Sequence, residues 1–148
     1  MKFSKGLLFF SILVLMLFAA CTSTPSQQPT SLHVTRVGTM ERTNVSPRSW
    51  VITDTYAVQQ LFNEIQNLPT HHNNGADSCA MSYYTYHLNF FAGTKSIAKD
   101  DLYAYCSTLS SSPGGTDEKL YDPTQSFNSL FAKMLQVSPN NLSGRPTP

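Results

Sequence analysis

The sequence predicts an α+β fold, an antiparallel sheet of four to five strands with two amphipathic helices packed on one face. The first observation behind this prediction is an apolar stripe with helical spacing in two separate segments, 58–68 and 127–135. The second is a regular alternation of apolar and polar residues over 84–90, as in a half-buried strand. Each helix has one apolar face that must be covered, and the order β-β-α-β-β-(β)-α provides an antiparallel sheet to cover it.

Four strands and a short fifth one are expected along the chain. Two precede the first helix, at residues 32–37 and 50–52. The third alternates in character, and its apolar set is Tyr84, Tyr86, Leu88 and Phe90. After a turn at 92–95, the fourth runs towards Leu102, Ala104 and Cys106, with Tyr103 and Tyr105 on its opposite face. The segment 110–115 is rich in Ser, Pro and Gly and predicts a loop, and 119–121 predicts a short edge strand.

The first helix is indicated by one apolar stripe with clear boundaries. The stripe consists of Val58, Leu61, Phe62, Ile65 and Leu68. Thr53 or Asp54 can cap the N-terminus, because a short oxygen-bearing side chain accepts a hydrogen bond from a free backbone N–H there. Pro69 ends the helix, since proline cannot continue it.

The second helix has an equally clear stripe, made of Phe127, Leu130, Phe131, Met134 and Leu135. We expect Asp122 as its N-cap, with Pro123 at the first helical position and Gln125 placed for a capping box. Ser138 and Pro139 end it. The segment 138–148 is rich in Pro and polar residues and predicts a disordered tail.

The N-terminal segment has the three parts of an export signal. Lys2 and Lys5 are followed by an apolar stretch from residue 6 to 20, and small residues lead into Cys21. The stretch is shorter than a membrane-spanning helix requires and is not followed by a basic cluster. The tetrad at 18–21 resembles the lipobox of bacterial lipoproteins, with Phe18 where that motif prefers Leu.

We therefore expect residues 1–20 to be a lipoprotein signal peptide and Cys21 to carry lipid. Residues 21–30 then form a flexible tether, because the stretch after Cys21 contains Ser, Thr, Pro and Gln and no apolar side chain. A single α+β domain follows over 31–137. This places the domain on the extracytoplasmic face of a bacterial membrane, either the plasma or the outer membrane.

The cysteine count supports the same prediction. There are three cysteines, and an odd number in an exported protein leaves one to be explained. If Cys21 carries lipid, Cys79 and Cys106 remain as a pair, and a hairpin that turns near Gly93 brings them together. We expect a disulfide between them, because an exported chain meets an oxidising environment. A catalytic or redox thiol is disfavoured, since the sequence contains no CxxC motif.

Residues 50 to 136 resemble a group of small uncharacterised lipoproteins of Gram-positive and Chloroflexi-type bacteria. The resemblance lies in a Thr-Asp helix start at 53–54, a Leu-Pro end at 68–69, and a final amphipathic helix at 127–135. Between the two helices come Cys79, a Tyr-x-Leu-x-Phe strand at 86–90, and Cys106. This chain has Ala80 where those relatives often have Pro. The resemblance implies a fold and a location, and it implies no activity.

Histidines are the main candidates for chemistry. His71 and His72 lie in a polar segment, and His87 lies on the third strand. They could serve a small hydrolase or a metal-dependent enzyme, but none of them has the ligand spacing of known zinc motifs. No cofactor motif is present, so we expect a chain without a cofactor and without enzymatic activity, and we keep the histidine-based enzyme as the alternative.

Aromatic residues suggest a surface for a protein or glycan partner. Tyr83, Phe91, Tyr103 and Tyr105 can share the outer face of the sheet. They can equally stabilise the sheet by cross-strand pairing, or lie under the N-terminal strands. Of the ten Lys and Arg residues, two lie in the expected signal, which leaves eight against nine Asp and Glu. This balance gives no basic patch, so a nucleic-acid partner is not expected.

Overall fold

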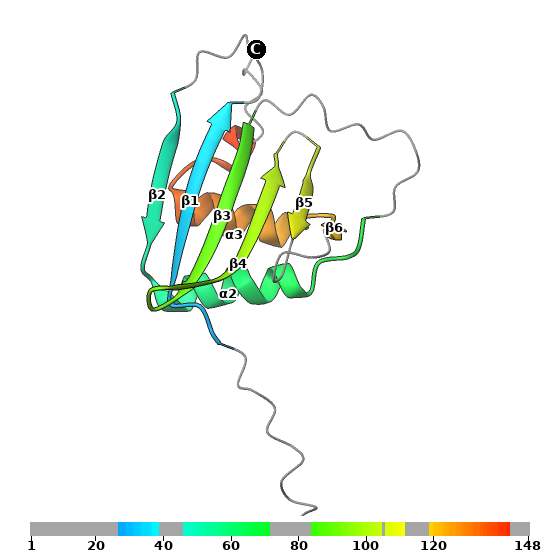
Figure 1. The fold of residues 1–148 in the computed structure, drawn as a ribbon. Coiled ribbons are helices and arrows are strands. Elements are labelled where there is room, and N and C mark those ends of the chain that lie inside the picture. The colour runs from blue at the N-terminus through cyan, green and yellow to red at the C-terminus, as the bar shows by residue number, and fades with distance from the viewer. Residues whose placement is uncertain (1–26, 39–45, 72–83, 105, 112–118, 143–148) are drawn as a thin grey trace, which may run out of the picture.

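The computed structural model describes residues 27–38, 46–71, 84–104, 106–111 and 119–142. It confirms the α+β class. Six strands form one antiparallel sheet in the order β2-β1-β3-β4-β5-β6, and the helices cover one face of it (Figure 1). The elements are β1 (Ser31–Gly38), β2 (Arg48–Ile52), α2 (Thr55–Gln66), β3 (Tyr84–Ala92), β4 (Lys95–Tyr103), β5 (Thr108–Ser111), β6 (Lys119–Tyr121), α3 (Gln125–Leu135) and the short 3₁₀ helix η2 (Pro139–Asn141).

The sheet has one strand more than the largest number predicted. The additional strand is β5, and part of it, Ser110 and Ser111, lies where we expected a loop. Ser111 pairs with Asp100 and Ser110 with Asp101, so neighbouring strands override the preference of serine for turns. The fourth strand is correspondingly shorter than expected. It ends at Tyr103, and Cys106 belongs to the turn that leads through Ser107, whose φ is 49°, into β5.

Both helices bury the predicted stripe, but only one has the predicted cap. At α2, Asp54 accepts a hydrogen bond from the backbone N–H of Ala57 at 3.2 Å. At α3, the cap is Thr124, which accepts from Phe127 at 3.1 Å. Asp122 is not the cap because its carboxylate lies 2.5 Å from His71 Nδ1 instead. The helix consequently begins at Gln125.

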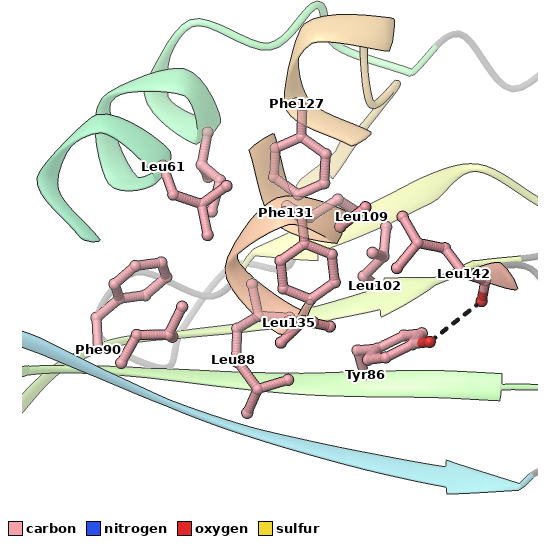
Figure 2. Close-up of a cluster of buried hydrophobic side chains, with 14 of the residues drawn as sticks. Leu61, Tyr86, Leu88, Phe90, Leu102, Leu109, Phe127, Phe131, Leu135 and Leu142 are labelled. Atoms are coloured by element: carbon pink, nitrogen blue, oxygen red, sulfur yellow. Dashed lines mark hydrogen bonds between the residues drawn. The ribbon is translucent and has the colours of Figure 1, made fainter. Parts of the chain in front are cut away.

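The core lies between the helices and the sheet. The apolar side chains of β3 alternate as predicted and meet aromatic and leucine side chains of α3, and the core includes Leu61, Leu88, Phe90, Leu102, Leu109, Phe127, Phe131 and Leu135 (Figure 2). The predicted disordered tail is wrong at its start. Residues 139–141 form η2, and Leu142 is buried in the core, where its carbonyl accepts a hydrogen bond from Tyr86 at 3.3 Å. Apolar burial of Leu142 thus orders a Pro- and Asn-rich segment.

The two edges of the sheet differ. Residues 69–71 lie along β6, where the His71 N–H donates to Leu120 and the Asp122 N–H donates to Pro69, both at 2.9 Å. Thr70 also forms a β-bridge with Tyr121. Within the described residues, β2 is paired with β1 alone. In the same part of the chain, no helix is long and apolar enough to cross a membrane.

Candidate functional site

The two members of the predicted aromatic surface that the structure describes lie far apart. Phe91 and Tyr103 both lie on the outer face, the sheet face opposite the helices, but at opposite ends of the β3–β4 pair. Phe91 is opposite Ser96, whereas Tyr103 is opposite Thr85. The six residue steps from Thr85 to Phe91 span roughly 20 Å of strand. The ring centres of Phe91 and His33 are 4.6 Å apart. Tyr83 and Tyr105 lie outside the described residues.

The histidines do not converge either. His87 lies on the outer face, and its Nδ1 is 2.7 Å from Asp101 Oδ1, with the two side chains 49% and 42% exposed. His71 lies beside β6 and contacts Asp122, so β4, β5 and β6 separate it from His87. His72 lies outside the described residues. In the described part of the chain, no group of three or more His, Cys, Asp or Glu side chains is arranged to hold a metal ion.

The cysteine predictions fall largely on other parts of the chain. Cys106 is the one cysteine in the described residues, and it is disulfide-bonded. Cys21 and Cys79 lie outside those residues. Lipidation of Cys21 and the pairing of Cys79 with Cys106 therefore stay predictions.

A group that the sequence did not reveal lies on the helix side of the sheet, where β1, β2 and β3 meet. It consists of Arg36 on β1, Arg48 and Trp50 on β2, and Tyr84 and Tyr86 on β3. We call these five residues the arginine–aromatic cluster. The strand register creates it, since Arg36 is opposite both Arg48 on β2 and Tyr86 on β3.

Both guanidinium groups of the cluster lie against aromatic rings. The Cζ atom of Arg36 is 4.6 Å from the ring centre of Tyr84 and 5.9 Å from that of Trp50. The Cζ atom of Arg48 is 4.8 Å from the ring centre of Trp50. Cation–π contacts at these distances are attractive and favour these positions of the guanidinium groups. The rings thereby orient the positive charges before any ligand arrives.

Polar atoms at the base of the cluster are shielded from water. The Nε of Arg36 and the Nε1 of Trp50 are buried without a hydrogen-bond partner. Burial raises the pKa of the Tyr86 phenol, and the charge and hydrogen bond of Arg36 oppose this rise. At neutral pH the phenol is therefore neutral and does not compensate the charge of Arg36.

Two positive charges stand directly opposite each other in this cluster. Like charges in a directly opposed cross-strand pair destabilise a sheet. The ion pairs among the described residues join His71 to Asp122 and His87 to Asp101, and neither guanidinium has a carboxylate within ion-pair distance in this part of the chain. Such an arrangement is suited to an anion, whose charge would remove the repulsion between Arg36 and Arg48.

A partial signal for the cluster was present in the sequence. Alternation in 32–37 places Arg36 in phase with the buried Leu32 and Val34, and Arg48 is in phase with Trp50. An arginine in the core-facing phase of a strand is unusual, because a charge is rarely placed towards a core without a partner. The pattern could not show that the two arginines meet, since this depends on the β1–β2 register.

Comparison with known proteins assigns no family and no function to this chain. The resemblance of residues 50–136 to small bacterial lipoproteins stays a prediction from sequence. No protein-family model, no curated protein and no solved structure matches this chain.

Proposed function

We propose that this chain is a bacterial lipoprotein, anchored by lipid on Cys21 at the extracytoplasmic face of a membrane, with a non-enzymatic binding domain. We further propose that the domain binds an anionic group at the arginine–aromatic cluster. The export signal before Cys21 and the odd cysteine count support the anchor. The cluster supports the binding role.

One observation carries the binding proposal, namely that Arg36 and Arg48 oppose each other with no carboxylate partner in the described residues. The planar guanidinium group matches carboxylate, phosphate and sulfate oxygens, with which it forms paired hydrogen bonds. Trp50 and Tyr84 hold the two groups in place, so less conformational entropy is lost when an anion binds.

The contact between His87 and Asp101 favours a second candidate, a small hydrolase or a metal-dependent enzyme. A carboxylate at Nδ1 fixes the tautomer of an imidazole and can prepare Nε2 for proton transfer. However, both side chains are about half exposed, and water weakens electrostatic interactions at such a position. His71, which the same hypothesis invoked, is held in a separate contact with Asp122. We therefore place binding first.

Trp50 allows a direct test, because it is the only tryptophan of the chain. The full chain in detergent micelles is titrated with citrate or inorganic phosphate at constant ionic strength, and tryptophan emission is recorded. We expect a saturable change in the wild type. Arg48→Gln should weaken binding roughly 10- to 100-fold, since a charge-assisted hydrogen bond contributes about 1.5–3 kcal/mol.

Lys99→Gln is the matched control, because Lys99 is an exposed cation on the outer face of β4. It should titrate like the wild type. An emission change that is the same with chloride, or that persists unchanged in Arg48→Gln, would contradict anion binding at the cluster.

The anchor is tested by metabolic labelling with palmitate in a bacterial host. Cys21→Ala should lose the label completely and move the chain from the membrane fraction to the soluble fraction, because no other residue is expected to carry lipid. Cys79→Ala is the control for nonspecific thiol labelling and should retain the label. Label on Cys21→Ala would rule out the proposed anchor.

A further inference from the structure

In the part of the chain that the structure describes, the edge of the sheet at β2 is open, whereas the edge at β6 is closed. Residues 69–71 run along β6 and form backbone hydrogen bonds with it. In the described residues, β2 has β1 as its only partner, and it forms the outermost strand of the sheet in Figure 1. An outermost strand presents a row of free backbone N–H and C=O groups that can pair with another extended chain.

The arginine–aromatic cluster lies at the beginning of this edge strand. Arg48 and Trp50 belong to both, and Ile52 follows them on the same, helix-facing side. These three positions are spaced two residues apart, about 6.6 Å per step. A single extended ligand lying along β2 would therefore meet a guanidinium, an indole and an apolar side chain in succession.

A groove begins where this row ends. It lies between the end of β2, the start of α2 and the end of α3, has a volume of about 450 Å³, and is lined among others by Ile52, Leu130 and Met134. Val51 and Tyr56 also line it, and they are the large apolar side chains exposed in the described part of the chain, at 65% and 78%. The groove thus offers apolar surface beside an open strand edge.

Charge along this edge favours an acidic ligand. Arg48 lies at one end of β2 and Lys133 lines the groove at the other. The carboxylate that lines the groove, Asp54, already accepts a hydrogen bond from the first turn of α2. A ligand with a carboxylate near Arg48 and an apolar side chain in the groove would match both ends.

We infer that β2 receives an extended acidic peptide as an added strand. The acidic side chain lies at the arginine–aromatic cluster, and an apolar side chain four positions along enters the groove. Addition to a strand edge combines backbone hydrogen bonds with side-chain pockets at alternate positions. This inference rests on the proposed anion site for its acidic end, and it adds the class of partner, namely an extended protein segment.

The test uses the full chain in detergent micelles and the peptide acetyl-Glu-Thr-Val-Thr-Leu-Thr-amide, with Trp50 emission as readout. The reference probe is acetyl-glutamate amide, which carries the same carboxylate but cannot form a strand. We expect the peptide to bind at least about 10-fold more tightly than the reference, because several backbone hydrogen bonds and an apolar contact are added.

Two N-methylated isomers of the peptide separate strand addition from simple charge attraction. One is methylated on the odd residues and the other on the even residues. Because only one alternating set of N–H groups faces β2, one isomer should lose the gain in affinity and the other should keep it. If both isomers bind as tightly as the parent peptide, strand addition is overturned.

Protein variants locate the two ends of the ligand. Arg48→Gln should weaken binding of the peptide and of the reference probe to the same extent. Tyr56→Ala should lower the affinity for the peptide by about 3- to 10-fold and leave the affinity for the reference probe unchanged, because the groove loses an apolar wall. Leu120→Ala on the closed β6 edge is the control and should change neither. If Leu120→Ala weakened peptide binding and Tyr56→Ala did not, the peptide would bind elsewhere and the inference would be overturned.

The failure of this inference can be distinguished from that of the proposed function. If the chain responds to citrate but binds the peptide no more tightly than acetyl-glutamate amide, the anion site is supported and strand addition is overturned. If the chain responds to none of the probes, both the anion site and strand addition are contradicted. Tighter binding of oligogalacturonate than of the peptide would assign the edge to an acidic glycan. A concentration-dependent dimer that the peptide does not dissociate would assign it to a second copy.

Discussion

Replacing Phe131 by alanine is expected to lower the free energy of unfolding by about 3–5 kcal/mol, the usual range for a buried phenylalanine. Phe131 is fully buried on α3 and lies at the centre of the core (Figure 2). Its ring stacks on Phe127, with the ring centres 5.8 Å apart, and meets Tyr86 edge-on at 5.4 Å. The substitution would remove apolar burial and both aromatic contacts, and it would leave a cavity under the sheet.

Equilibrium unfolding in urea, followed by far-ultraviolet circular dichroism, measures this loss. Tyr56→Ala is the matched control, because it also deletes an aromatic ring from a helix but at a position that is largely exposed. The control should change stability by no more than about 0.5 kcal/mol. A loss below about 1 kcal/mol in Phe131→Ala would show that α3 does not pack on the sheet as described.

Tyr86, a neighbour of Phe131, connects the core to the arginine–aromatic cluster. Tyr86 contacts Phe131 on one side, donates a hydrogen bond from its hydroxyl group to the carbonyl of Leu142, and lies opposite Arg36 in the β1–β3 pairing. Its ring also lies 6.4 Å from that of Trp50. The base of the cluster is therefore part of the core, and this continuity fixes the positions of groups whose outer atoms reach solvent.

Local pattern was sufficient to predict the helices and most strands. The stripe of α2 and the alternation in β3 depend only on neighbours within a few residues, and both were predicted correctly. The errors have tertiary causes. Asp122 has the right chemistry for a cap, but His71, 51 residues away in sequence, contacts its carboxylate. Ser110 and Ser111 resemble a loop in isolation and become a strand because β4 and β6 lie on either side.

The candidate site depends on strand register, so the sequence could place Arg36 and Arg48 in the core-facing phase but could not show that they meet. Arg36 and Arg48 are separated by twelve positions and a segment with no clear pattern, and a shift of one residue in the β1–β2 pairing would send one of them to the outer face. Two members of the predicted aromatic surface were separated for a related reason. Phe91 and Tyr103 share a face, as predicted, but the long β3–β4 hairpin places them at its two ends.

Replacing Asp100 by asparagine is expected to stabilise the protein at pH 8 by about 2–3 kcal/mol. Asp100 lies on the helix side of β4, opposite Leu88 and Ser111, and is only 3% exposed. Burial raises the pKa of its carboxyl group from 3.8 to about 6, a hydrogen bond from Ser111 partly opposes this, and the charge of Asp101 adds to it. One carboxylate oxygen, Oδ1, is buried without a hydrogen-bond partner.

The direction of the pH dependence follows from proton binding. Because the pKa of Asp100 is higher in the folded state than in the unfolded chain, the folded state binds the proton more tightly. The resulting stabilisation is complete below pH 3.8 and is lost as the pH rises through about 6. The difference between the two pKa values corresponds to roughly 3 kcal/mol, which the neutral amide of asparagine retains at every pH.

Urea unfolding of the wild type and of Asp100→Asn at pH 3 and pH 8 measures the effect. The two proteins should be of similar stability at the lower pH, and the variant should be clearly more stable at the higher pH. Asp101→Asn is the control, since the neighbouring carboxylate faces water beside His87, and its loss should change stability by at most about 1 kcal/mol. A variant that is less stable than the wild type at pH 8 would mean that the charged carboxylate of Asp100 has a compensating partner. In that case β4 carries an ion pair on its helix side, and the buried oxygen is satisfied.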